Sequence, residues 1–185
     1  MDIICISGKA RSGKDTIAQE LRKVLTESGK RVIVTHYADF LKYICREYYH
    51  WDGEKDEYGR TLLQTVGQSF RDSNPDCWVQ IMNGFISGLQ NDIDVVIIAD
   101  CRYKNELLEL RLPCRGNIYT IRIERPNFDN QLTEQQKLHK SEVDLDDCLF
   151  NLYVNNDGDE DQYKAKAKRI MLEYGIFCGY VKNRI

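Results

Sequence analysis

Short apolar runs alternate along this chain with longer stretches in which apolar residues recur at helical spacing. Residues 2–7 form the first apolar run, and the stretch after it repeats apolar side chains every three or four positions from Ile17 to Leu25. Gly29 provides a stop signal for that helix. Residues 31–36 then predict a second strand. This order of strand, helix and strand indicates the start of a parallel α/β sheet.

Three helices are predicted in the next part of the chain. Residues 39–50 form the first helix, and the polar residues 51–56 separate it from a second helix with apolar positions between Leu62 and Phe70. Residues 73–76 read Ser-Asn-Pro-Asp, which predicts a helix start with a capping side chain and a proline at the first helical position. The third helix follows, with an apolar face suited to a core.

The second half of the chain returns to strands. Residues 94–100 are rich in β-branched side chains and predict a fully buried strand, while residues 117–124 and 149–154 predict two more. A last helix is expected over residues 160–174. The whole pattern predicts one α/β domain over residues 1–185, built on a parallel sheet.

The polar segment over residues 125–147 is long for a connection inside a compact domain. It follows a strand whose carboxyl end would open toward a ligand at the edge of the sheet. We therefore expect a mobile lid over the ligand in preference to a simple surface excursion.

Charge and hydropathy narrow the range of partners. The formal net charge is −3, which provides no basic footprint for nucleic acid or for an anionic membrane. No apolar run reaches the length of a membrane span, and the first strand begins close to Met1, which leaves no room for a signal peptide. We expect a cytoplasmic protein whose partners are small-molecule nucleotides. Whether it forms a homodimer is left open by the sequence.

Seven cysteines are spread along the chain, and their spacing argues against a metal site. The count is odd, and no two of them have the two-to-four-residue spacing typical of zinc ligands. We therefore expect reduced thiols, several of them in the core.

Residues 8–15 read Gly-Lys-Ala-Arg-Ser-Gly-Lys-Asp and carry the strongest functional signal. They match a phosphate-binding loop, except that Asp15 stands where Ser or Thr is usual and the hydroxyl follows at Thr16. The glycines let backbone amides surround an anion, the next helix adds its positive end, and the lysine reaches the outer phosphates. A glycine-rich turn without a ligand is the alternative. The residues expected at the nucleotide are Gly8, Ala10, Arg11, Ser12, Gly13, Lys14, Asp15 and Thr16.

Charged residues near the predicted strand ends extend this candidate site. Asp100 ends a strand that can lie beside the loop, where a carboxylate holds Mg²⁺ directly or through water, although an Asp that merely ends a strand is also common. The guanidinium of Arg102 can bind a phosphate through two parallel N–H···O hydrogen bonds. The charged residues in or near the lid that could meet a phosphate are Arg122, Arg125, His139, Lys140 and Glu142.

An acceptor-binding region is expected over about residues 37–91. Asp39 there either caps a helix or meets a substrate. A polar helical stripe with spacings of four, four and three consists of Arg60, Gln64, Gln68 and Arg71. Such a stripe usually faces solvent, but two amides and two guanidiniums also suit a base edge and a phosphate.

With these motifs in place, the chain resembles the bacteriophage-type deoxynucleoside monophosphate kinases. The resemblance covers most of the chain up to about residue 158, and an Asp after the loop lysine is normal in that family. Position 68 holds Gln where the family has Thr, and position 40 holds Phe where Pro is usual. The matching segments are residues 8–16, 37–42, 62–67, 74–79, 98–106 and 139–142, with Leu145 and Asp146 shortly after.

The resemblance implies an α/β P-loop NTPase fold with a five-stranded parallel sheet in the order 2-3-1-4-5 and a lid. It implies ATP and Mg²⁺ as cofactors and transfer of the γ-phosphoryl group to a (deoxy)nucleoside 5′-monophosphate. The candidate catalytic residues are Lys14, Asp100, Arg102 and Arg125, and the candidate metal residues are Asp15, Thr16 and Asp100. The loop against adenine corresponds to Asn155, Asn156 and Gly158. The candidate acceptor residues are Asp39, Lys42, Arg60, Gln64, Gln68, Arg71, Trp78, Arg102, His139 and Glu142.

Three alternatives stay open at this point. Animal-type phosphomevalonate kinases share the loop style, the Asp-x-Arg strand end and the Ser-Glu element of the lid. A nucleotide-hydrolysing switch or ATPase is the second, although the chain lacks the Asn/Thr-Lys-x-Asp element by which GTPases read guanine. The third is a nucleotide-binding module without activity, against which Lys14, Asp100 and Arg102 argue.

Overall fold

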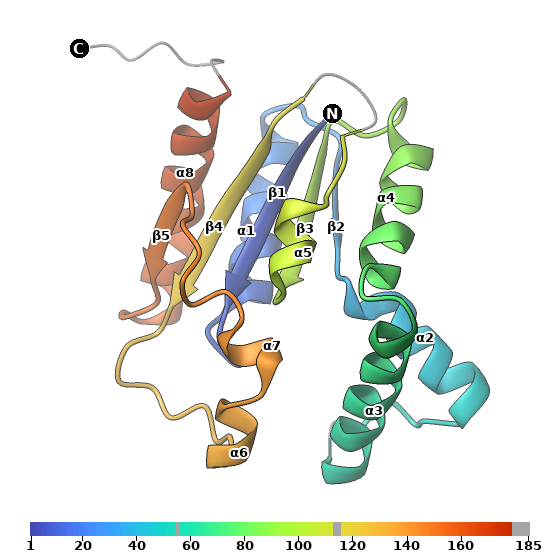
Figure 1. The fold of residues 1–185 in the computed structure, drawn as a ribbon. Coiled ribbons are helices and arrows are strands. Elements are labelled where there is room, and N and C mark those ends of the chain that lie inside the picture. The colour runs from blue at the N-terminus through green and yellow to red at the C-terminus, as the bar shows by residue number, and fades with distance from the viewer. Residues whose placement is uncertain (55, 113–115, 179–185) are drawn as a thin grey trace.

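The computed structural model describes residues 1–54, 56–112 and 116–178. Its centre is one parallel sheet in the order β2-β3-β1-β4-β5, which confirms the predicted fold class and strand order (Figure 1). β1 occupies the middle of the sheet, and every residue in it is buried. The strands are β1 (Asp2–Gly8), β2 (Val32–Thr35), β3 (Val95–Cys101), β4 (Ile118–Glu124) and β5 (Leu152–Asn155).

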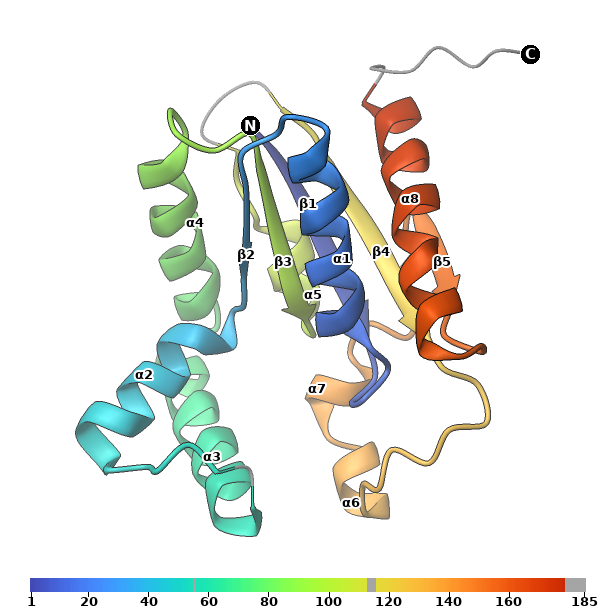
Figure 2. The same ribbon diagram turned by 180° about the vertical axis from the view of Figure 1, so that it is seen from behind.

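Helices cover both sides of this sheet. The helices on one side are α1 (Lys14–Glu27) and α8 (Glu160–Phe177), which pack against each other (Figure 2). Those on the other side are α4 (Cys77–Leu89) and the short α5 (Lys104–Leu108). Two more helices extend past the carboxyl ends of the strands, and these are α2 (Ala38–Tyr49) and α3 (Glu57–Ser73) (Figure 1).

Strand side chains alternate between two apolar cores. Ile4 and Ile6 of β1 belong to the core that includes α1 and α8, whereas Ile3 and Cys5 belong to the core that includes α2, α3 and α4. The strand register aligns the carboxyl ends at one edge of the sheet, because Ser7 near the end of β1 pairs with Cys101 at the end of β3. This edge is where the loops that follow the strands come together.

The lid segment (residues 125–147) contains two four-residue helices, α6 (Glu134–Lys137) and α7 (Lys140–Val143), that the sequence did not predict. Helices of this length show no apolar periodicity, and their signals are local caps. The Thr133 hydroxyl accepts a hydrogen bond from the amide of Gln136 at 3.2 Å. The lid helices lie beyond the carboxyl ends of the strands, across from α2 and α3 (Figures 1 and 2).

The expected start of the third helix needs correction. α4 begins at Cys77, and Pro75 lies in the turn before it instead of at the first helical position. The side chain of Asn74 accepts a hydrogen bond from the amide of Asp76 at 3.1 Å, so the signal in the sequence marks this turn.

Two composition-based expectations can be compared with the structure. No helix within the described ranges combines the length and hydropathy needed to cross a bilayer. The six cysteines in the described residues are free, and Cys5, Cys45 and Cys101 are buried, which confirms that several are core residues.

Candidate active site

The loop between β1 and α1 packs so closely that its glycines are required. Gly13 has a φ of 96°, in the left-handed region. A Cβ at Gly8 would lie 2.6 Å from the carbonyl oxygen of Ile123, and one at Gly13 would lie 2.7 Å from Nδ2 of Asn156. The hydroxyl of Ser12 is buried and has no hydrogen-bond partner within the described residues. The loop therefore brings its backbone and one buried hydroxyl to a position where a ligand can use them.

Lys14 is buried at the first position of α1 and bends back onto this loop. Its Nζ donates to the carbonyl oxygens of Gly8 at 2.8 Å and of Lys9 at 2.7 Å. Burial, and then the nearby charge of Arg102, lower the pKa of Lys14 to about 8. The ammonium group is still mainly charged at neutral pH, and it lies beside the groups expected to meet phosphates.

The segment after β5 supports the loop from outside. Asn156 Nδ2 donates to the carbonyl oxygen of Ser12 at 3.0 Å, and the Tyr163 hydroxyl donates to that of Gly13 at 3.0 Å. Asn155 and Gly158, which the resemblance also placed here, are exposed. Tyr163 was not predicted, because a buried tyrosine in the last helix looks like an ordinary core residue in the sequence.

Asp100 connects the end of β3 to the start of α2. Its carboxylate accepts hydrogen bonds from the amides of Tyr37 at 2.7 Å and of Ala38 at 3.1 Å. This contact holds the start of α2 at the carboxyl edge of the sheet. Each carboxylate oxygen has a second lone pair, so these bonds leave acceptor capacity on Asp100.

The lid is tied to the loop by Glu142. Its Oε2 accepts a hydrogen bond from the amide of Ala10 at 2.8 Å, and its Oε1 pairs with the guanidinium of Arg102. The backbone oxygen of Glu142 accepts from Lys9 Nζ at 2.6 Å. Asp146, at the end of the lid, pairs with Lys9 and lies 2.6 Å from Nη2 of Arg122. The Glu142 carboxylate thus occupies two donors, the Ala10 amide and the Arg102 guanidinium, that the sequence assigned to phosphates.

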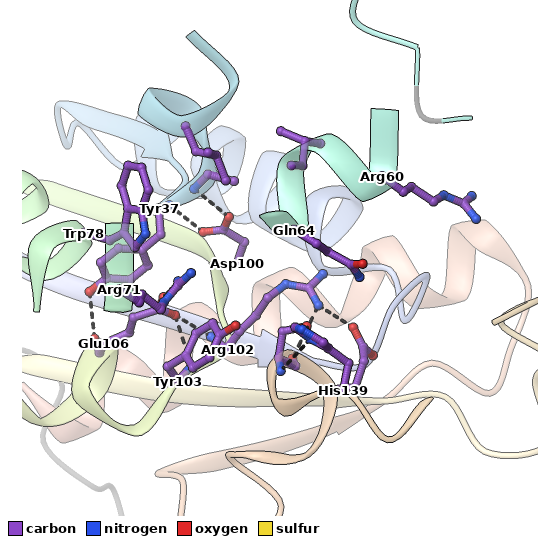
Figure 3. Close-up of a pocket in the computed structure, with 15 residues that line it drawn as sticks. Tyr37, Arg60, Gln64, Arg71, Trp78, Asp100, Arg102, Tyr103, Glu106 and His139 are labelled. Atoms are coloured by element: carbon purple, nitrogen blue, oxygen red, sulfur yellow. Dashed lines mark hydrogen bonds and ion pairs between the residues drawn. The ribbon is translucent and has the colours of Figure 1, made fainter. Parts of the chain in front are cut away.

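A cavity of about 270 Å³ opens between α2, α3, β3 and the lid (Figure 3). It contains three arginines together with an amide and an apolar wall, which is the mixture expected for a phosphate and a planar ring. Arg60 extends away from the other labelled side chains. The lining residues are Tyr37, Ala38, Leu41, Arg60, Leu63, Gln64, Arg71, Trp78, Asp100, Arg102, Tyr103, Glu106, His139, Ser141 and Glu142.

Glu106 is a cavity residue that the candidate list lacked. Its carboxylate lies 3.1 Å from Nη2 of Arg71 and accepts the amides of Arg102 at 2.7 Å and Tyr103 at 3.1 Å. The guanidinium carbon of Arg71 is 3.9 Å from the centre of the Tyr103 ring. The signal in the sequence was the position of Glu106 four residues after Arg102, in a segment too short to be recognised as a helix.

Other candidates lie at the rim of the site or outside the cavity. Gln68 donates to Asp72 at 2.7 Å on the exposed side of α3. Of the polar stripe, only Arg60, Gln64 and Arg71 therefore line the cavity. Lys42 donates to Asp39 at 3.1 Å. Arg125 donates to the carbonyl oxygen of Arg11 at 3.2 Å, which places it at the outer side of the loop.

The expected metal residues are spread along the edge of the sheet. Asp15 is 79% exposed, and its Oδ1 lies 3.0 Å from Nε2 of His36. Hydrogen bonds with Asp15 and then with Asp39 raise the pKa of His36 to about 9. Thr16 follows in α1 and is half-buried. Within the described ranges, no group of three or more His, Cys, Asp or Glu side chains is arranged to hold a metal ion by itself.

Comparison with known proteins identifies the fold. No protein-family model and no curated protein matches the chain. A sugar kinase from Janibacter sp. HTCC2649 is 12% identical over 99% of each chain, with a TM-score of 0.54. The APS kinase of Mycobacterium tuberculosis in complex with AMPPNP and APS is 11% identical over 94% of this chain and 96% of that chain, with a TM-score of 0.51. A gluconokinase from Sinorhizobium meliloti 1021 is 13% identical over 95% of each chain, with a TM-score of 0.50.

These similarities and the strand order show that the chain has the α/β fold of P-loop NTPases. The loop over residues 8–15 stands at the position that this fold gives to its phosphate-binding loop, directly after the central strand and before the first helix.

Proposed function

We propose that the protein is a phosphotransferase that moves the γ-phosphoryl group of ATP to a (deoxy)nucleoside 5′-monophosphate and produces the diphosphate. The observation that carries this proposal is a cavity lined by Arg71 and Arg102 beside the phosphate-binding loop. Arg102 also lies close enough to Lys14 to lower its pKa, so Arg102 is shared by the cavity and the loop. The phosphates of ATP at the loop and of an acceptor in the cavity would both lie beside this guanidinium.

The loop fits the phosphates of ATP through its own geometry. Gly8 and Gly13 leave no space for a side chain, and the buried Ser12 hydroxyl has no partner within the described residues. Mg²⁺ prefers carboxylate, hydroxyl and water oxygens, and Asp15, Thr16 and Asp100 offer the first two kinds along the carboxyl edge of the sheet. When bound, the cation would neutralise charge on the outer phosphates.

Positioning by the protein's own side chains supplies the rest of the proposed mechanism. The acceptor phosphate is itself the nucleophile, so the reaction needs no strong general base. Arg71 would bind the acceptor phosphate, Arg102 would contact both phosphates, and Lys14 would stabilise charge on the transferred group. The Trp78 ring and the amide of Gln64 line the same cavity, where they would meet the base.

A coupled ADP-release assay tests this proposal. ATP and Mg²⁺ are supplied with each of the eight common nucleoside and deoxynucleoside 5′-monophosphates in turn, and with phosphomevalonate. We expect acceptor-dependent ADP release with at least one nucleotide. Turnover of phosphomevalonate alone would assign a different acceptor, and ADP release without any acceptor would assign an ATPase.

A further inference from the structure

Glu106 is a buried carboxylate that contacts the side chain of Arg71 and the backbone of Arg102, two of the three arginines that line the acceptor cavity. Its side chain is 3% exposed. Oε1 lies 3.1 Å from Nη2 of Arg71, and Oε2 accepts the backbone amides of Arg102 and Tyr103. A buried carboxylate is costly unless its oxygens are hydrogen-bonded and its charge is paired. Both conditions are met here by residues that line the cavity.

Arg71 is held on three sides. Besides Glu106, its Nη1 donates to the carbonyl oxygen of Gly67 at 3.3 Å, and its guanidinium lies over the Tyr103 ring (Figure 3). These contacts use two of the five N–H donors of a guanidinium. A guanidinium held in this way loses less rotational freedom when it binds a phosphate, which favours binding.

We propose that Glu106 is a positioning residue that holds Arg71 toward the acceptor phosphate and links it to the backbone of Arg102 at the transfer point. This inference rests on the proposed function. It adds to that function a residue that acts through Arg71 and does not touch the substrate.

The charge on Glu106 makes this link sensitive to pH. Burial, and then the charge of Asp100, raise the pKa of Glu106 to about 7, while the amide of Arg102 and the charge of Arg71 oppose the rise. Protonation below that pH removes the charge that holds Arg71, so acceptor binding should weaken as the pH falls. The titratable or charged groups that face Glu106 are Tyr37, Arg71, Asp100, Cys101, Arg102 and Tyr103.

A Glu106→Gln variant separates the positioning role from a merely structural one. The amide oxygen of Gln can still accept the backbone amides of Arg102 and Tyr103, while its NH₂ group then faces Arg71 and cannot accept from it. The matched control is Glu109→Gln, because Glu109 lies exposed three residues further along the same segment.

We expect Glu106→Gln to raise the KM for the nucleoside monophosphate that turns over best by about tenfold, with kcat within about threefold of wild type. The rise of KM below pH 7 should be smaller in this variant than in wild type and in Glu109→Gln. A part of it persists in every variant, because the acceptor phosphate itself titrates at about pH 6. Arg71→Gln and the double variant Arg71→Gln/Glu106→Gln should share one KM, because the two residues act as a unit. An unchanged KM in Glu106→Gln, or a loss of kcat alone, would overturn the proposal.

A second readout does not depend on turnover. NMR signals of the Arg71 guanidinium, recorded with and without inorganic phosphate, should titrate near pH 7 in wild type and in Glu109→Gln but not in Glu106→Gln. Failure of every acceptor in the assay would reject the proposed function, whereas an Arg71 signal unaffected by Glu106→Gln would reject the link itself.

Discussion

Lys14 donates to two carbonyl oxygens of its own loop. In the proposed function a phosphate would take over these bonds, because the lysine side chain is already buried at the loop. The residue is therefore a preorganised donor, and its contribution should be greatest where negative charge develops during transfer.

Lys14→Ala should lower kcat/KM by about 10²–10³-fold, or ~3–4 kcal/mol of transition-state stabilisation, the typical loss for one preorganised donor. The coupled ADP-release assay measures this change. Lys23→Ala is the control, because Lys23 is exposed on the same helix α1. Near-normal turnover in Lys14→Ala would contradict the assignment of the phosphate-binding loop.

At the scale of elements, the loop and the lid are held together by one carboxylate. Glu142 accepts from the amide of Ala10 and pairs with Arg102, and its side chain is 7% exposed. In the proposed function, ATP phosphates would need the same two donors. We therefore expect the Glu142 carboxylate of the lid to compete with ATP for the loop.

Glu142→Gln should tighten the binding of AMPPNP by about three- to tenfold, because a neutral amide competes less well than a carboxylate for these donors. Isothermal titration calorimetry measures the dissociation constant. Glu134→Gln is the control, since Glu134 lies exposed in the lid and pairs with Lys137. Weaker binding in Glu142→Gln would show instead that the carboxylate orients Arg102 for the nucleotide.

The close packing of the loop can be tested with two glycines in different elements. Gly8→Ala places a Cβ against the Ile123 carbonyl and should destabilise the protein by about 2 kcal/mol or more. Gly84→Ala, in the interior of α4, should stabilise it by about 0.5–1 kcal/mol, because the added Cβ would meet no atom outside its own stretch of helix within 4 Å. Urea unfolding measures both, and equal effects at the two positions would contradict the packing described for the loop.

The dependence of stability on pH is a property of the whole molecule, and His36 contributes to it by joining α1 to α2. Its two ring nitrogens lie 3.0 Å from Asp15 and 3.1 Å from Asp39. The pKa of His36 is raised from 6.5 to about 9. Its contribution should be complete below pH 6.5, the unfolded value, and lost as the pH rises through 9.

The free energy of unfolding of wild type should exceed that of His36→Gln by about 1 kcal/mol at pH 6, because the exposed carboxylates are partly screened by solvent. The difference should be close to zero at pH 10. Urea unfolding of both proteins at the two pH values measures it. A difference that grows with pH would show that the ring is neutral in the folded protein.

Much of the fold could be predicted because its signals are local. Apolar runs and helical periodicity in residues 2–36 and 94–124 identified four strands and one helix close to their observed bounds. Helices α5, α6 and α7 were missed because four or five residues contain no period. The polar stripe of α3 was found, but only its position against α2 and the lid separates Arg60, Gln64 and Arg71 from Gln68.

The order of the strands and longer helices along the chain, and the glycine-rich loop with Lys14, follow from local sequence, because these features depend on neighbours a few residues apart. Which polar and charged groups contact each other depends on the tertiary structure. Glu142 reaches Ala10 across 132 positions of the chain, and Glu106 reaches Arg71 across 35. Such pairs form because the parallel sheet brings distant loops to the same edge, and no local pattern records that proximity.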